Sequence, residues 1–188
     1  MPVDAASRQA TALGGWRYAP VAVLLHWLLA ALIVSMAALG WTMVSIEDEN
    51  EAFADSLRHL HETVGVVVFV LVLARLAWRL THRPGALPAS VARWEVVASL
   101  LVQRLLYTGM ILLPVTGMLG ASYTRDGLVL FGQRVPAWHA PVHDTAEAWF
   151  EVHETIVWIM VGLVALLALA GMKHAFVVRD GVFQRMWP

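Results

Sequence analysis

Residues 18–46, YAPVAVLLHWLLAALIVSMAALGWTMVSI, contain no Lys, Arg, Asp or Glu. About 20 apolar residues are enough for a helix to cross a bilayer, so this stretch predicts a membrane span over 20–44. The composition of the whole chain supports the prediction, because 59% of its 188 residues are hydrophobic and only 14% are charged. This composition indicates an integral membrane protein in contact with the lipid bilayer.

Three further apolar runs predict three more spans, so the expected fold class is an all-α, integral membrane four-helix bundle. These spans run from about His59–His61 to Arg79, from about Val96 to Thr124, and from about Val152 to His174. Three connections are predicted between the spans. They are a solvated acidic loop over 47–55, a Pro- and Gly-containing connector over 82–88, and a loop over 125–150 with a short amphipathic surface piece.

Four spans place both termini on one side of the membrane. Of the thirteen Lys and Arg residues, nine lie on that side: Arg8, Arg17, Arg75, Arg79, Arg83, Arg93, Lys173, Arg179 and Arg185. By the positive-inside rule both termini are predicted to be cytoplasmic. The expected organisation is a tail over 1–17, a membrane domain over 18–178 and a second tail over 179–188.

Residue usage narrows the cofactor classes. The chain has no cysteine, which excludes disulfides, thiolate-ligated iron–sulfur clusters and haem attached through Cys-x-x-Cys-His. A net charge of −1 gives no electrostatic support for a nucleic-acid partner. A bound metal would therefore depend on the eight histidines, the carboxylates or the methionines.

One short phrase occurs twice, as His61-Glu-Thr-Val and as His153-Glu-Thr-Ile. Both histidines open a span from the outer side, so they lie at similar depth and can face each other across a bundle. A planar macrocycle with one axial ligand from each helix suits this arrangement. The alternative is a pair of interfacial histidines bonded to loops. Gly65, one turn after His61, would leave room for a ring edge or would allow close helix packing.

A second, inner site is suggested by His26, although an interfacial histidine is the alternative. At 1.5 Å per residue, His26 lies roughly 27 Å below the outer end of its helix and cannot reach the outer pair. Arg75 follows His61 by 14 residues, which places it on the same helix face at inner depth. There it could bind a haem propionate, or its side chain could extend to the lipid headgroups.

Several of these residues, in their order and spacing, resemble the bacterial cytochrome b561 family over nearly the whole chain from Tyr18. The resemblance rests on the segments His26-Trp27, His61 with Gly65, Arg75-Leu-Ala-Trp-Arg79, Leu106-Tyr107 with Pro114 and Gly117, Phe131-Gly132, His153-Glu154, Lys173-His174-Ala-Phe, Arg179-Asp180 and Arg185-Met-Trp-Pro188. It implies a bacterial inner-membrane cytochrome with two b haems, each held by two histidines, that exchanges electrons with a quinone such as ubiquinone. Arg75, Arg104 and Gly65 are the residues expected to contact the cofactor.

The chain departs from the family pattern at one ligand. The family places a histidine 14 residues after the position of His153, as the partner of His26, and here that position is Leu167. Three arrangements of the inner site are open: His26 with His174, His26 alone, or no inner haem. The pair His26 and His174 is preferred, because the spans offer no other histidine at inner depth.

Three functions follow from these observations. The first is electron transfer to or from the quinone pool, with a redox partner protein as a further expected contact. The second, seen in close members of the family, is oxidation of superoxide at the outer face. Arg58, Arg125 and Arg134 could attract that anion there, although the surrounding acids oppose it. The third is a haem-poor anchor subunit of a membrane redox complex.

Overall fold

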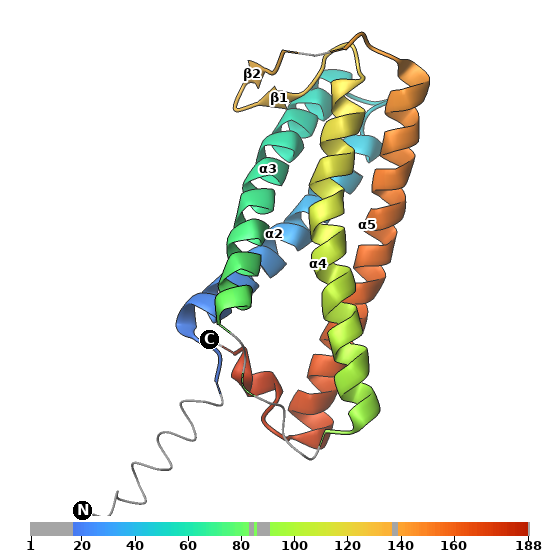
Figure 1. The fold of residues 1–188 in the computed structure, drawn as a ribbon. Helices are drawn as coiled ribbons and strands as arrows, with labels where there is room; N and C mark the ends of the chain where they lie inside the picture. The colour runs from blue at the N-terminus through green and yellow to red at the C-terminus, as the bar shows by residue number, and fades with distance from the viewer. Residues whose placement is uncertain (1–16, 83–84, 86–90, 137–138, 188) are drawn as a thin grey trace, which may run out of the picture.

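Four long helices form the body of the protein in the computed structural model, which describes residues 17–82, 85, 91–136 and 139–187. They are α2 (Pro20–Ser45), α3 (Glu51–Thr81), α4 (Arg93–Ser122) and α5 (His143–Met172). Between α4 and α5 lie two short strands, β1 (Val129–Leu130) and β2 (Gln133–Arg134), and after α5 come a π-helical turn, η1 (Lys173–Val178), and a 3-10 turn, η2 (Phe183–Arg185). The helices run side by side in an elongated bundle (Figure 1).

Each of the four helices is long and apolar enough to span a membrane. Their most apolar 18-residue windows have mean hydropathies between 1.8 and 2.4. The predicted all-α, four-helix membrane fold is therefore confirmed, and the cytoplasmic placement of the termini stays a prediction. The predicted tail 1–17 and connector 82–88 lie mostly outside the described residues.

Two helices begin about two turns or more before their predicted starts. α3 starts at Glu51, because the Asn50 side chain caps it by accepting a hydrogen bond of 3.1 Å from the Phe53 amide. Asp55 is thus helical and pairs with Arg58, so the prediction of a loop up to residue 55 was wrong. α5 starts at His143 rather than near Val152, so it takes up the last part of the predicted 125–150 loop. Hydropathy marks the part of a helix that lies in lipid, and both helices continue beyond it.

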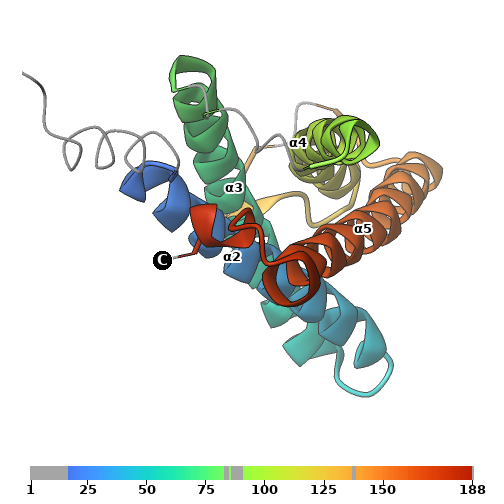
Figure 2. The same cartoon turned by 90° about the horizontal axis from the view of Figure 1, so that it is seen from below.

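The bundle is built from two helix pairs. The most extensive contacts join α4 to α5 and α2 to α3, whereas α3 and α4 share fewer, and the end-on view in Figure 2 shows this pairing. Glycines let α4 and α5 approach closely, because a Cβ on Gly109 would lie 2.3 Å from Met160 Sδ and one on Gly120 would lie 2.6 Å from the Phe150 ring. Few residues of the four spans are fully buried within the chain, as expected for helices whose outer faces contact lipid.

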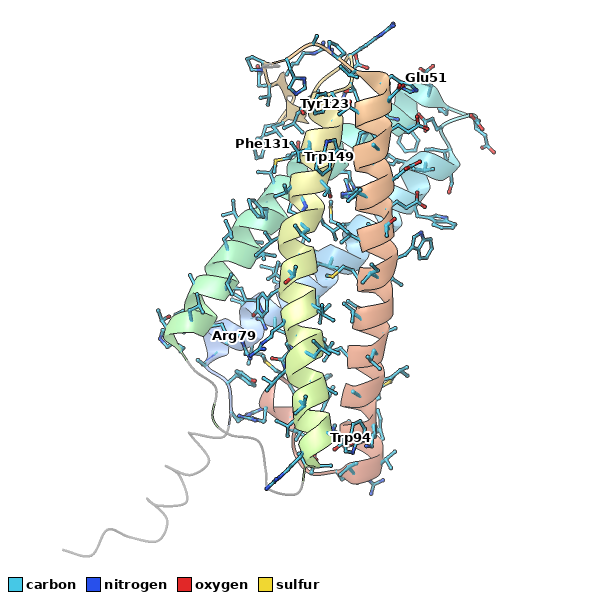
Figure 3. The ribbon with its side chains drawn as sticks, turned by 45° about the vertical axis from the view of Figure 1, so that its right-hand side comes forward. Glu51, Arg79, Trp94, Tyr123, Phe131 and Trp149 are labelled. Carbon is cyan, nitrogen blue, oxygen red and sulfur yellow. The ribbon has the colours of Figure 1, made fainter. Side chains whose placement is uncertain are left out.

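A small hairpin lies at one end of the bundle, against α3. Val129 pairs with Arg134 and Leu130 with Gln133, and the turn between them is Phe131-Gly132. Both turn residues have positive φ, 52° and 75°, as a two-residue type I′ turn requires. Figure 3 shows Phe131 and Tyr123 at this end, hereafter the hairpin end, and Arg79 and Trp94 at the other.

The opposite end, hereafter the termini end, is closed by the C-terminal segment. The Tyr18 amide donates to Arg185 O over 3.3 Å, and Trp27 Nε1 donates to Met186 O over 2.7 Å. The Arg185 side chain is only 3% exposed and donates to Gly85 O over 2.7 Å. The segment after residue 178 therefore packs against the start of α2.

Candidate functional site

His61 on α3 and His153 on α5 face each other at the hairpin end. Their ring centres are 6.3 Å apart, with an angle of 72° between the ring planes. The two helices belong to different pairs, so the two imidazoles meet between the pairs. The structure thus brings together the two histidines that open the repeated phrase, at the same depth, as the sequence predicts.

The His153 imidazole is held in one orientation. Its Nδ1 donates a hydrogen bond of 2.9 Å to Leu113 O, and Thr116 Oγ1 lies 3.2 Å from the same nitrogen. On the adjacent turn of α4, a Cβ added to Gly117 would come within 3.2 Å of the ring. Because Nδ1 carries the proton in this hydrogen bond, Nε2 has a free lone pair and can bind a metal.

The His61 imidazole has a different environment. Its Nδ1 is buried and has no hydrogen-bond partner among the described residues. The Nδ1–Cε1 edge faces α2, where a Cβ added to Gly40 would lie 3.3 Å from Cε1. Burying an imidazole nitrogen without a partner costs about 1–3 kcal/mol, so a histidine at this position is a functional candidate.

The outer pair fits an iron held by two histidines. A metal bound to two imidazole nitrogens at about 2 Å each separates the ring centres by roughly 6 Å, close to what is observed. Among the described residues no group of three or more potential ligands lies together. A haem iron does not need one, because the porphyrin supplies four ligands and the protein supplies the axial pair.

At the termini end, the predicted neighbour Arg75 lies beside His26. Arg75 Nη1 donates to Ala22 O over 2.9 Å, and Arg75 Nη2 lies 3.4 Å from His26 Nδ1. A guanidinium can only donate, so Nδ1 accepts and the imidazole proton is on Nε2. In this state His26 offers no free ring nitrogen to a metal, and the inner site fits a haem less well than the outer one.

His174, the preferred partner of His26, is bonded within the C-terminal segment. Its Nδ1 donates to Asp180 Oδ2 over 2.8 Å, and both side chains are nearly buried. No hydrogen bond or ring contact joins it to His26 within the part of the chain that the structure describes. Leu167 is half-buried on α5. The inner pair His26 and His174 stays a prediction.

Comparison with known proteins decides the family. The sequence model of prokaryotic cytochrome b561 matches residues 17–188. The chain belongs to this family. It is 27% identical to cytochrome b561 homolog 2 of Escherichia coli K12 over 90% of each chain, and 26% identical to homolog 1 of the same organism over 92% of this chain and 97% of that one. A protein named probable superoxide oxidase CybB, from Yersinia pestis, is 20% identical over 92% of this chain and 96% of its own.

Membership in the cytochrome b561 family makes this chain a bacterial membrane haem protein of the electron-transfer class. The family implies a b-type haem.

Two other predicted cofactor contacts have different surroundings. A Cβ on Gly65 would lie 3.6 Å from Met36 Cε, which is ordinary packing of α3 against α2. Arg104 is exposed on α4 and forms no hydrogen bond or ion pair with the described residues. The contact with Met36 supports the alternative that Gly65 serves close helix packing. A role for Gly65 or Arg104 in binding the cofactor stays a prediction.

Sequence reasoning missed three residues that shape the outer site: Gly40, Thr116 and Gly117. Gly117 is among the residues of the family resemblance, but the sequence alone assigns it no role. Gly40 lies on α2, 21 positions before His61, and gives no local signal. Small residues within apolar spans mark close helix contacts in general, and they do not identify the partner side chain.

Asp180 provides a test of the closed termini end. Burial raises the pKa of Asp180, but hydrogen bonds from the Val182 amide and from His174 outweigh it, so the pKa lies below the usual value. The stabilisation is therefore present above the ordinary aspartate pKa and is lost as pH falls through the lowered one. We expect Asp180→Asn to release the C-terminal segment from the bundle at neutral pH. In the wild type the same release should require a pH low enough to protonate Asp180.

A spin label measures this prediction. The chain has no native cysteine, so Gln184→Cys, at an exposed position, places a single label on the segment. Label mobility should increase in the Asp180→Asn background and should not change with Asp144→Asn, an exposed acid on α5. Equal mobility in all three backgrounds would show that the His174–Asp180 pair does not hold the segment.

Proposed function

We propose that this protein binds haem b between His61 and His153 and transfers electrons to or from the quinone pool of the bacterial inner membrane. The observation that carries the proposal is the pair of imidazoles, 6.3 Å apart, on helices of two different pairs. A b haem, when bound, supplies one-electron oxidation and reduction. Held by His61 and His153 together, it would act as an electron carrier rather than as an oxygen binder.

The protein residues supply orientation. Leu113 O and Thr116 hold the His153 ring with Nε2 free, and Gly117 and Gly40 leave room for the Nδ1–Cε1 edges of the two rings. Quinone is the proposed partner because it is a membrane-soluble carrier and the family suggests it.

Oxidation of superoxide is the second candidate, and the ion pairs at the hairpin end speak against it. Arg58 is paired with Glu47 at 2.8 Å and with Asp55 at 3.0 Å, and Arg134 is paired with Asp126 at 3.3 Å. Two of the three arginines expected to attract an anion are therefore compensated by carboxylates. Electron exchange with quinone is the function we favour.

The test is haem stoichiometry followed by quinone reduction. Protein purified from haem-replete cells should contain at least one b haem per chain, measured as pyridine haemochrome against amino-acid analysis. Two haems would mean that the inner site binds haem despite Leu167, and one would leave the outer pair alone. After reduction with dithionite and its removal, a short-chain ubiquinone should reoxidise the haem. Protein without haem would instead favour the anchor subunit, and haem that stays reduced would exclude the quinone role.

A further inference from the structure

The two copies of the repeated phrase differ in what their Glu and Thr contact. In the first copy, Glu62 Oε2 accepts a hydrogen bond of 2.9 Å from the Val129 amide, and Thr63 Oγ1 accepts one of 3.0 Å from the Phe131 amide. In the second copy, the hydrogen bond that Glu154 accepts from the described residues comes from Trp158 on its own helix. Thr155 is exposed on α5. Only the first copy binds the hairpin.

The outer edge of the hairpin, with the amides of Val129 and Phe131, faces α3. Val129 and Phe131 are two residues apart, so their amides point to the same side of β1. On the other side, Leu128 O accepts from the Val135 amide within the hairpin. The side chains of Glu62 and Thr63 thus take the place of a third strand and cover the free edge of β1.

These two hydrogen bonds connect the two helix pairs. The hairpin is fixed to the α4–α5 pair, because the Thr124 side chain accepts from the Gly127 amide over 3.1 Å and the Val142 amide donates to Tyr123 O over 3.0 Å. α3 belongs to the other pair and has fewer direct contacts with α4. The hairpin therefore joins α3 to the pair that carries His153, at the end where the two imidazoles meet.

The two histidines also differ in what orients them. His153 is held through Nδ1, whereas the buried Nδ1 of His61 has no partner among the described residues. The direction of the His61 ring then depends on the rotation of α3 about its axis and on packing against Gly40. Glu62 and Thr63 lie about 100° and 200° around the helix from His61, so a hairpin bound to both resists that rotation.

We propose that Glu62 and Thr63 are positioning residues for His61. Through the hairpin they fix the rotation of the first buried turns of α3 relative to the α4–α5 pair, and so they direct the His61 imidazole toward the metal. The inference rests on the proposed function in one respect, which is that the metal is the iron of a haem shared with His153.

The test compares matched changes in the two phrases. The variant is Glu62→Ala with Thr63→Val, and the control is Glu154→Ala with Thr155→Val, which removes the same groups from α5. Hydrogen exchange measured by mass spectrometry should become about tenfold faster or more for the peptide containing Val129 and Phe131, in the variant only. The low-spin electron paramagnetic resonance signal and the midpoint potential of the outer haem should shift in the variant and not in the control.

A conservative change separates positioning from general damage. Glu62→Gln keeps an oxygen acceptor for the Val129 amide. This single variant, with Thr63 unchanged, should therefore show the wild-type resonance signal and midpoint potential. Faster exchange with an unmoved signal and potential would overturn the inference, and so would unchanged exchange. A wild-type protein without haem would overturn the proposed function itself, which is a different result from haem that is present and insensitive to Glu62 and Thr63.

Discussion

Replacing His61 or His153 with alanine is expected to remove the outer haem from the purified protein. In the proposed site each imidazole would supply one of the two protein ligands of the iron, so a single substitution would leave a cavity and one ligand. We expect at least a tenfold loss of haem at this site in either variant. Pyridine haemochrome per chain and the height of the Soret band measure it. If the wild type binds two haems, the loss should stop at one haem per chain.

The matched control is His143→Ala. His143 begins α5, the helix that carries His153, and its side chain is 88% exposed with only a long contact to Glu147. This variant should keep the wild-type haem content, and all three variants should elute from size exclusion as the wild type does. Normal haem content in His61→Ala and His153→Ala would show that the outer pair is not the ligand set.

The spans could be predicted because lipid imposes a direct requirement on them, namely about 20 consecutive residues with almost no charge. The helix ends could not, since nothing in lipid determines them. The Asn50 side chain caps the start of α3 by accepting a hydrogen bond from the Phe53 amide. On the helix surface, Arg58 forms an ion pair with Asp55. Charged residues there are compatible with a helix as well as with a loop, and the cap decides.

The site was predictable to the extent that it depends on depth and helix face. His61 and His153 lie near the same end of their helices and face each other. Arg75 follows His61 by 14 residues, nearly four turns, which places it on the same face of α3 at the depth of His26. The partners of the rings depend instead on which helices pair. That Gly40 faces His61 and Thr116 faces His153 follows from the pairing of α2 with α3 and of α4 with α5, which apolar periodicity does not specify.

The C-terminal residues show the same limit. A helical continuation of α5 would carry His174 deeper on the face of Leu167. The sequence favours His174 as the partner of His26 because the spans offer no other histidine at inner depth. In the structure α5 passes into a π-helical turn that ends at Arg179 with φ of 56°. The chain then reverses, and Asp180 Oδ2 accepts the hydrogen bond that His174 Nδ1 donates. A reversal of this kind arises from local backbone geometry, which a helical wheel cannot represent.

The second large effect is expected from Gly117→Ala. The added methyl group would lie 3.2 Å from Cε1 and 3.3 Å from Nδ1 of His153. The His153 ring cannot easily move away, because its Nδ1 donates a hydrogen bond of 2.9 Å to Leu113 O, which lies on α4 one turn before Gly117. Overpacking of this kind costs about 1–3 kcal/mol, so haem affinity should fall by about tenfold or the ring should turn and change the low-spin resonance signal.

Gly162→Ala and Gly40→Ala complete the comparison. Gly162 lies on α5, and a Cβ added to it would meet nothing within 4 Å, so alanine there should leave haem binding unchanged while adding the same helix-favouring methyl group. Gly40→Ala presses on His61 at 3.3 Å, but that ring has no hydrogen bond through Nδ1 to the described residues that would hold it. It should therefore lose less haem than Gly117→Ala and shift the resonance signal more. The opposite order, with Gly40→Ala losing more haem, would mean that His61 and not His153 is the rigidly held ligand.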